Sequence, residues 1–569
     1  MRTLLNKLRE FKGANIVLFV VFATTIYLQC CFFHESLDLP WNPKLVYFKI
    51  FKISIAILIA SFIFFFKHKS WIIYISTFIN LWGISNIMYR RANQILIDAY
   101  SVTMVNNMDG FWSSVPFYMD VNDFTIFYTT LIVTLTYILF RNKRRSISSG
   151  IIAIILSIGI HIYSYERRVR FFPAYKPFIE KKLYNPFKLD HSTFACWDLY
   201  DKSLYTRDTS ILHHFLYQTN YFIQKILFVS PYKLSEQEEK KVNQFINKNQ
   251  SKLTPKNSVY IILVESFESW ALTPDVMPNL YNFINENNVL WVQKITSQTR
   301  GGTSADGQMI INTGLLPTKE GAACFRFPNN TFPAISKLYD KTFNIIPGGQ
   351  TVWNQVHMNV AYRIKDNIDG TANDKELVGQ FMDLYKKYDY GMLLTMSTHS
   401  PFNRFSNQSK LSLPADMPKY MSDYLKSFNY TDESFKPILD AIKNDEHLKN
   451  SVIVITGDHT IFPKQKRDEF NKYCQDKSQN YSVNDGYCPL IIYSPNFKEQ
   501  TTICDIKYQM DIFPTILSAI GCKDYYWNGF GVDLLDSTNI SNRKISATEA
   551  LELSDKLHQA NYFKYIDAE

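Results

Sequence analysis

Acidic and imidazole side chains follow three short, β-rich stretches of the sequence. Because the carboxyl ends of parallel strands meet at one edge of a sheet, we expect these side chains to lie close together. Carboxylate oxygens with an imidazole nitrogen form a plausible ligand set for a divalent metal ion. An acid or histidine after a single strand is more often a helix cap or loop residue, so the prediction depends on all three stretches. The residues are Glu265, His399, Asp458 and His459.

A hydroxyl that could act as a nucleophile lies in residues 300–308, RGGTSADGQ. The two glycines let the backbone turn sharply, and the hydroxyl of Thr303 or Ser304 could then stand at a helix N-terminus, where amides and the helix dipole favour a phosphoryl oxygen. A metal bound to that hydroxyl would lower its pKa and make the alkoxide available near neutral pH. An isolated turn of this type is more often an ordinary helix cap.

The sheet that would position these side chains is predicted from residue 257 onward. Short β-rich runs alternate there with helical segments, which is typical of a mainly parallel sheet flanked by helices. We therefore assign residues 257–569 to one α/β domain. Its predicted strands include residues 259–264, 390–396, 452–456 and 490–493.

Long apolar runs dominate the sequence before residue 166. A helix needs about 20 apolar residues to cross a hydrocarbon core of about 30 Å, and soluble folds rarely carry five such runs in succession. Lys49 and Lys52, near the start of the second run, could extend their ammonium groups to the interface. We predict a multi-pass membrane domain at residues 1–166, with five transmembrane helices at about 13–33, 46–66, 71–89, 124–141 and 149–165.

The placement of lysine and arginine predicts the orientation, because short cytoplasmic loops retain positive charge. The N-terminus and residues 67–69 and 141–145 are basic, whereas the opposing loops are mostly acidic. An odd number of crossings then places the chain after residue 166 on the outer face of the cytoplasmic membrane. Residues 167–256 are predicted to be a helical connector with helices at 211–228 and 235–249, and a membrane-lying role for the first helix stays open.

Net charge and cysteine content constrain the function and the fold less than the motifs and apolar runs do. A net charge of +9, much of it in the cytoplasmic loops, does not indicate nucleic-acid binding. In an oxidising compartment, the six cysteines after residue 166 permit up to three disulfides, and Cys474 with Cys488 is the easiest local closure. Buried free thiols are an equally good reading. The six are Cys196, Cys324, Cys474, Cys488, Cys504 and Cys522.

With these features together, the chain resembles the lipoteichoic acid synthase-like members of the sulfatase and alkaline phosphatase superfamily, which are related to phosphoglycerol and phosphoethanolamine transferases. The resemblance covers the whole layout of spans, connector and outer domain. It rests on short motifs in the same order, among them Val264-Glu265-Ser266, Met277-Pro278-Asn279-Leu280, Gly302-Thr303-Ser304, Asn330-Thr331-Phe332-Pro333, Val352-Trp353-Asn354 and Gly457-Asp458-His459.

The resemblance implies a site in which Thr303 is the nucleophile and His399 lies near the leaving or accepting oxygen. It also implies that Trp353 helps to line a head-group pocket. Manganese is the favoured metal, with magnesium and zinc as alternatives, because carboxylate and hydroxyl ligands with one imidazole fit all three. The implied metal ligands are Glu265, Thr303, Asp458 and His459.

Two departures from the family concern head-group recognition. In lipoteichoic acid synthases an arginine follows the Trp-Asn pair and a histidine precedes it, whereas Gln355 and residues Ile346 and Pro347 stand at those places here. Arg363 or His357 are the candidate substitutes. The formylglycine motif of true sulfatases is missing at the nucleophile position, so sulfate-ester hydrolysis ranks low.

The sequence thus predicts a metal-dependent transferase that moves phosphoglycerol or phosphoethanolamine from a phospholipid donor to an envelope glycan or glycolipid acceptor, through a phosphothreonine. A phosphodiesterase or other hydrolase of the superfamily is the alternative, and differs in whether water takes the head group. A non-catalytic membrane receptor or a transporter is a further alternative. Few ionisable residues besides His161 lie in the predicted spans, which disfavours a transport path.

Overall fold

The chain divides into two compact units. The first, called here the membrane unit, comprises Met1–Ala99 and Tyr118–Val229, and the second, the sheet unit, comprises Tyr100–Phe117 and Ser230–Glu569. The predicted division at residues 166 and 256 stays a prediction. The computed structural model describes Leu8, Met104 and residues 10–36, 46–93, 95–101, 111–142, 144–171, 210–223, 232–247, 253–484, 486–536 and 543–564.

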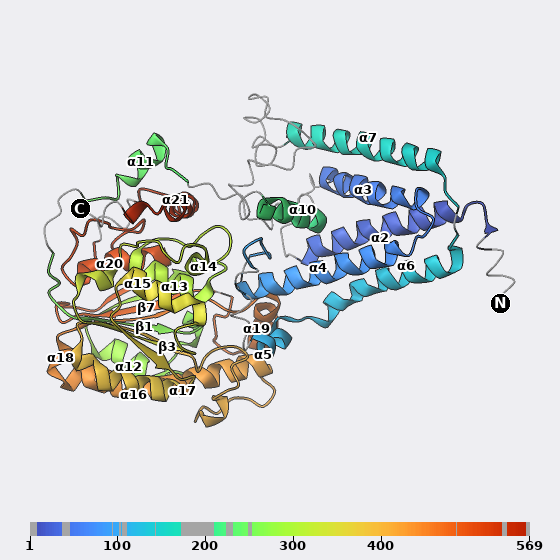
Figure 1. The fold of residues 1–569 in the computed structure, drawn as a ribbon. Coiled ribbons are helices and arrows are strands. Elements are labelled where there is room, and N and C mark those ends of the chain that lie inside the picture. Colours follow the sequence, from blue (N-terminus) through green and yellow to red (C-terminus); the bar gives the residue numbers. More distant parts are fainter. Residues whose placement is uncertain are drawn as a thin grey trace. The chain divides into compact units, whose positions relative to one another are not determined.

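The membrane unit is a bundle of apolar helices (Figure 1). In the described part of the chain, four stretches are long and apolar enough to cross a membrane, namely Ala14–Phe33, Trp71–Asn93, Val121–Phe140 and Ile147–Ser164. They lie in α2 (Ala14–Ser36), α4 (Trp71–Asn93), α6 (Phe127–Phe140) with the 3-10 turn Val121–Ile126 before it, and α7 (Ile147–Phe171).

The predicted count of five spans is too high by one among the described residues. The second predicted span, residues 46–66, is α3 (Val46–Ser61), which a 3-10 turn at Phe62–Phe64 follows. At 1.5 Å per residue, its 16 residues rise only about 24 Å, which is less than the hydrocarbon thickness of about 30 Å. α3 packs along α7, where the Ser157 hydroxyl donates to the Ser54 carbonyl at 2.6 Å.

Hydrogen bonds bring the start of α2 and the loop between α6 and α7 to the same end of the bundle. Asn15 Nδ2 donates to the Arg144 carbonyl at 3.2 Å. Lys69 Nζ donates to the carbonyls of Asn142 and Arg144 at 2.9 and 3.0 Å. The helix α7 begins three residues after Arg144 and runs for 25 residues. The start of α2 and the end of α7 therefore lie at opposite ends of the bundle.

The sheet unit is built on one eight-stranded sheet in the order β4-β3-β5-β1-β6-β7-β2-β8 (Figure 1). Only β7 runs antiparallel to its neighbours β6 and β2, so the predicted fold class, apolar helices followed by a mainly parallel α/β domain, is confirmed. The strands are β1 (Val259–Val264), β2 (Val289–Thr296), β3 (Thr342–Pro347), β4 (Asp366–Gly370), β5 (Tyr390–Leu394), β6 (Val452–Gly457), β7 (Cys488–Tyr493) and β8 (Thr501–Tyr508).

Helices cover both faces of this sheet. Every residue of the central strands β1, β5 and β6 is buried, as expected for parallel strands enclosed on two sides. In Figure 1, α12, α16 and α17 lie on one face, and α13, α15 and α20 lie on the other. The helices are α12 (Pro278–Glu286), α13 (Thr303–Thr313), α14 (Ala323–Arg326), α15 (Gln355–Tyr362), α16 (Asp374–Leu384), α17 (Lys419–Asn444), α18 (Glu446–Lys449), α19 (Lys464–Asp476), α20 (Ile512–Ala519) and α21 (Ala547–Ala560).

Both predicted connector helices are present, and the second is shorter than predicted. α10 (Ile211–Tyr221) packs on α4 in the membrane unit, where Trp82 Nε1 donates to the Ile211 carbonyl at 3.2 Å. α11 (Glu236–Val242) begins with a capping box, in which Ser235 and Glu238 satisfy each other's backbone amides. The rest of the predicted first helix, after residue 223, lies outside the described residues.

The local disulfide that the sequence left open, between Cys474 and Cys488, is not formed. Cys474 and Cys488 are both buried free thiols, and all seven cysteines in the described part of the chain are free. The alternative reading, buried thiols, therefore holds for Cys474 and Cys488. Cys196 lies outside the described residues.

Candidate functional site

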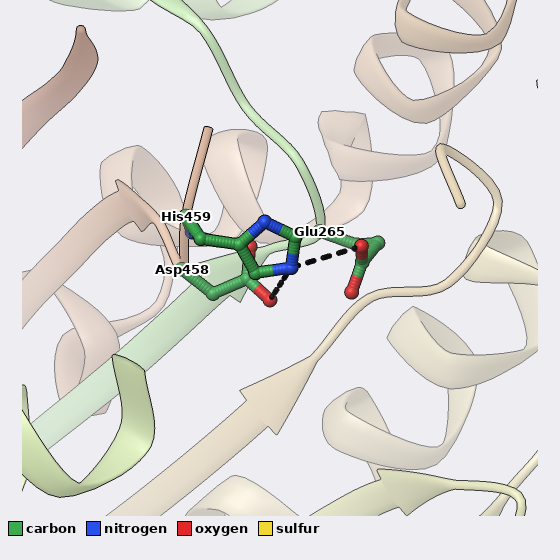
Figure 2. A group of neighbouring side chains, drawn as sticks. All are labelled: Glu265, Asp458 and His459. Atoms are coloured by element: carbon green, nitrogen blue, oxygen red, sulfur yellow. Dashed lines mark hydrogen bonds and ion pairs between the residues drawn. The ribbon is translucent and has the colours of Figure 1, made fainter. Parts of the chain in front are cut away.

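Three of the predicted metal ligands converge at the carboxyl edge of the sheet (Figure 2). Glu265 directly follows β1, and Asp458 and His459 directly follow β6, its parallel neighbour. One potential ligand atom from each side chain lies within 4.8 Å of the others. His459 Nε2 is 3.5 Å from Glu265 Oε1 and 3.6 Å from Asp458 Oδ2. Two carboxylates and an imidazole at this spacing could hold a divalent cation.

The cluster is buried, and its charged groups shift one another's pKa values. Glu265, Asp458 and His459 are 3%, 0% and 6% exposed. Burial raises the pKa of Asp458 to about 7, and the Glu265 carboxylate adds to that rise. Burial would also raise the pKa of Glu265, but the nearby His459 and His399 lower it overall. For His459 burial acts in the opposite direction, and the two carboxylates outweigh it, so its pKa is raised.

One carboxylate oxygen in the cluster supports a cation site. Asp458 Oδ1 accepts hydrogen bonds from the amides of Ser266 (2.9 Å) and His459 (2.8 Å). Asp458 Oδ2 is buried and has no hydrogen-bond partner among the described residues. A buried carboxyl oxygen without a hydrogen-bond partner costs free energy unless a proton or a cation reaches it. The ligand set therefore fits a divalent metal ion.

A carboxylate within α13 fixes the glycine turn that precedes this helix. Asp306 Oδ2 accepts hydrogen bonds from the amides of Arg300 (2.9 Å) and Gly302 (3.0 Å). A Cβ on Gly302 would lie 2.2 Å from Asp306 Oδ1, so only glycine fits there. Thr303, the next residue, has φ +37°, a conformation that is costly for a β-branched residue. The Asp306 carboxylate thus helps to hold the predicted nucleophile in an unfavourable backbone conformation.

Of the two adjacent hydroxyls, Ser304 contacts the cluster directly. Ser304 Oγ donates to Glu265 Oε2 at 3.1 Å and lies 3.3 Å from His459 Nε2. Thr303 is half-buried at the first position of α13. The assignment of Thr303 as nucleophile and fourth ligand stays a prediction.

The other predicted site residues lie on three further segments of the sheet unit. His399 is half-buried, its Nδ1 is 2.8 Å from the Ser400 carbonyl, and it lowers the pKa of Glu265. Trp353 packs its ring against Phe325 with centroids 6.2 Å apart. Arg363 is exposed at the end of α15. The roles of His399, Trp353 and Arg363 at the site stay predictions.

Gln355, which stands where lipoteichoic acid synthases have an arginine, is buried. Its Nε2 donates to Gln308 Oε1 on α13 at 3.0 Å. Ile346 and Pro347, at the place of the family's histidine, are buried at the end of β3. His357, one of the two candidate substitutes, is exposed and lies 2.9 Å from Asn354 Oδ1.

Sequence reasoning missed the polar groups that fix the ligand loops. The buried Glu268 accepts a hydrogen bond from the Ile461 amide at 2.9 Å. Glu268 also forms a two-pronged ion pair with Arg467: Nη2 of Arg467 is 2.6 Å from Glu268 Oε1, and Nη1 is 2.9 Å from Glu268 Oε2. Glu268 thereby ties the loop after β1 to the loop after β6. Gln509 Nε2 donates to the Asp458 carbonyl at 2.7 Å. A second acid three residues after the first ligand was a signal for Glu268, whereas no local pattern indicated Gln509.

Comparison with known proteins gives matches consistent with this geometry. Residues 324–522 match the sulfatase family. Lipoteichoic acid synthase 2 of Bacillus subtilis is 26% identical over 312 residues, which cover 48% of this chain and 46% of that protein. The chain thus spans about half the length of that relative. Lipoteichoic acid synthase of Staphylococcus saprophyticus is 22% identical over 582 residues, which cover 93% of this chain and 85% of that protein.

One of the solved structures to which the chain is similar is an integral membrane protein. The lipooligosaccharide phosphoethanolamine transferase A of Neisseria meningitidis aligns with 89% of this chain and 95% of its own, at 12% identity and a TM-score of 0.48. Residues 324–522 therefore match the sulfatase family, and the chain is similar in sequence to proteins named lipoteichoic acid synthase.

Proposed function

We propose that the chain is a metal-dependent transferase that moves phosphoglycerol or phosphoethanolamine from a phospholipid to an envelope glycan or glycolipid. The observation that carries this proposal is the convergence of Glu265, Asp458 and His459 beside the start of α13, where the hydroxyl-bearing residues Thr303 and Ser304 stand. The relatives named lipoteichoic acid synthase support the reaction class.

The proposed metal ligands are the three clustered side chains and the Thr303 hydroxyl. A divalent cation bound there would lower the pKa of a coordinated hydroxyl and offset negative charge on phosphoryl oxygens. Manganese is our choice, and magnesium and zinc also suit oxygen ligands with a single imidazole.

The proposed reaction has two displacements at phosphorus. The Thr303 oxygen attacks phosphorus in line, and the bond between phosphorus and the diacylglycerol oxygen breaks. The His399 ring donates a proton to that departing oxygen, and later accepts one from the acceptor hydroxyl, which displaces the Thr303 oxygen. Trp353 and Arg363 are proposed to contact the head group.

We place the catalytic domain on the outer face of the cytoplasmic membrane. Support comes from the bundle, because α2 begins and α7 ends at opposite ends of it. The basic residues near the start of α2 and between α6 and α7 belong on the cytoplasmic side. α3, although shorter than a full span, returns the chain to Lys69 at the end of the bundle where α2 begins. The chain beyond α7 then emerges outside, where lipid donors of the outer leaflet and envelope acceptors are found.

The test uses the purified full-length chain with phospholipids labelled in different head groups, with and without added Mn²⁺. We expect diacylglycerol release from one donor, dependent on metal, and transfer of its label to a glycolipid acceptor. Release of the label to water at the same rate with acceptor present would indicate a hydrolase. A chain that releases no diacylglycerol from any donor with metal would refute the proposal.

The nucleophile is tested by a matched pair of variants. Thr303→Ala is expected to lower turnover by at least about 10³-fold, since covalent catalysis is lost. Ser304→Ala is expected to cost much less, because its hydroxyl supports Glu265 and His459 without forming the covalent bond. The reverse order of effects would make Ser304 the nucleophile.

A further inference from the structure

A short segment between two membrane helices belongs to the sheet unit. Residues Tyr100–Phe117 follow α4 and precede α6 in the sequence, yet they group with the sheet unit. The segment contains most of α5 (Phe111–Tyr118), which includes Ser114 and Phe117. Both side chains are almost fully buried, at 2% and 1% exposed. The sheet unit therefore has a part that does not come from the chain after residue 230.

Ser114 binds the peptide next to His399. Ser114 Oγ donates to the Ser400 carbonyl at 3.0 Å, and Ser400 Oγ donates back to Ser114 Oγ at 2.9 Å. The same Ser400 carbonyl lies 2.8 Å from His399 Nδ1. The Ser400 carbonyl oxygen, with its two lone pairs, thus accepts hydrogen bonds from both the imidazole and the Ser114 hydroxyl.

This arrangement assigns the tautomer of His399. A carbonyl accepts only, so the Nδ1 that faces it carries the hydrogen. In the neutral ring, Nε2 then has the lone pair and can accept a proton. Because Ser114 holds the accepting carbonyl, its hydroxyl also influences the orientation of the ring.

Phe117 contacts two loops of the site at once. Its ring packs edge-on against Phe402 and Phe462, with centroids 5.4 and 5.8 Å away. Phe402 follows His399 by three residues, and Phe462 follows His459 by three. The aromatic contact therefore links the loops that carry the two histidines.

We propose that Ser114 and Phe117 are positioning residues for His399. In this role α5 fixes the Ser400 carbonyl, which engages Nδ1 and leaves Nε2 to the reacting oxygen. The inference rests on the proposed function, because that function gives His399 its role in proton transfer. It goes beyond that function by making the segment between α4 and α6 a required part of the site.

The first test is steady-state diacylglycerol release by the full-length chain. General acid-base catalysis contributes about 10²–10⁴-fold to a rate, and misplacing the group forfeits part of it. Ser114→Ala is therefore expected to lower kcat roughly tenfold with an unchanged KM for the lipid. Ser114→Thr, which retains the hydroxyl, should restore most of kcat. Ser482→Ala changes an exposed loop serine of the same unit and should have the kcat and KM of the native chain.

The kinetic outcomes separate this inference from the proposed function. An active native chain with the same kcat in Ser114→Ala would overturn the positioning role alone. A loss in Ser114→Ala that Ser114→Thr does not restore would also overturn it, because the hydroxyl would then not be responsible. A native chain without metal-dependent turnover would overturn the proposed function, and the positioning role with it.

A second test measures the contact without relying on activity. Two serine oxygens 2.9 Å apart bring their Cβ atoms near the spacing that a disulfide needs. Ser114→Cys with Ser400→Cys, in a full-length chain carrying a protease site within residues 190–200, should keep the two fragments joined until reduced. Ser114→Cys with Ser482→Cys, which also spans the cut, is the control and should separate. If the two fragments of the Ser114→Cys, Ser400→Cys chain separate under oxidising conditions, the placement of α5 is contradicted.

Discussion

Each unit contains a buried network of polar side chains, and these two networks differ in kind, although the membrane unit also buries the Arg91–Asp123 ion pair. In the membrane unit, Gln29 Nε2 donates to Ser76 Oγ (3.0 Å) and Asn80 Oδ1 (2.8 Å), and Asn80 Nδ2 donates to Thr130 Oγ1 (3.0 Å). These groups are neutral and join α2, α4 and α6. In the sheet unit, the buried groups at the strand ends are ionisable. Neutral amides and hydroxyls can hold helices together, whereas clustered buried charges are costly and point to chemistry.

The largest expected stability effect is at a buried charge of the sheet unit. Glu268→Gln removes the anion that neutralises Arg467, and breaking a buried pair costs about 3–5 kcal/mol. We expect a clear fall in the Tm of the sheet unit. Asp416→Asn, which breaks the ion pair with Lys477 where both side chains are about half exposed, is the control and should cost about 0–1 kcal/mol. Similar shifts for the two variants would contradict the importance of burial.

A smaller, pH-dependent effect is expected at Asp306. Burial raises the pKa of Asp306 to about 6 from an ordinary value of 3.8. The protonated form is therefore favoured in the folded state, and this contribution to stability is lost as the pH rises from about 4 through 6. Asp306→Asn keeps an acceptor for the Arg300 and Gly302 amides without titrating.

The measurement is the Tm of native chain and Asp306→Asn against pH, with a chelator present. The stability of the native chain relative to the variant should fall between pH 4 and 6, by on the order of 1–3 kcal/mol. Parallel curves of Tm against pH for the two proteins would show that the pKa of Asp306 is not raised in the folded chain.

The smallest effect is expected in the neutral network of the membrane unit. Asn80→Leu should destabilise the bundle by about 0.6 kcal/mol for each hydrogen bond lost, because polar contacts between membrane helices are individually weak. Head-group transfer should not change. Tyr74→Leu, at an exposed position of the same helix, is the control for detergent unfolding. If Asn80→Leu also loses head-group transfer, the neutral network is not purely structural, and its contrast with the ionisable groups of the sheet unit does not hold.

The strands that carry the ligands could be predicted because they are buried on both faces. β1 matches its predicted bounds, and β5 and β6 differ by one or two residues, since their apolar runs are continuous. β4, with the sequence DNIDG, could not be predicted, because an edge strand with exposed positions carries no apolar pattern. The same reasoning explains why Glu265, Asp458 and His459 could be predicted to meet, since each directly follows a recognisable strand.

Other features depend on contacts that no local pattern encodes. The packing of Phe117 against Phe402 and Phe462 joins segments far apart in the sequence. Which of the two adjacent hydroxyls faces the cluster depends on the turn held by Asp306, whose backbone hydrogen bonds have no signal in sequence spacing. The length of α3 was overestimated because the apolar run continues through the 3-10 turn that ends the helix.

The central claim, covalent transfer through Thr303, can be tested by one mass measurement. The native full-length chain is incubated with donor lipid and Mn²⁺ without acceptor, then digested with trypsin, which releases residues 301–319. We predict that this peptide gains the mass of the phosphorylated head group, with fragmentation placing it on Thr303, and that added acceptor removes it. An adduct on Ser304, or continued turnover with an unmodified peptide, would contradict the account.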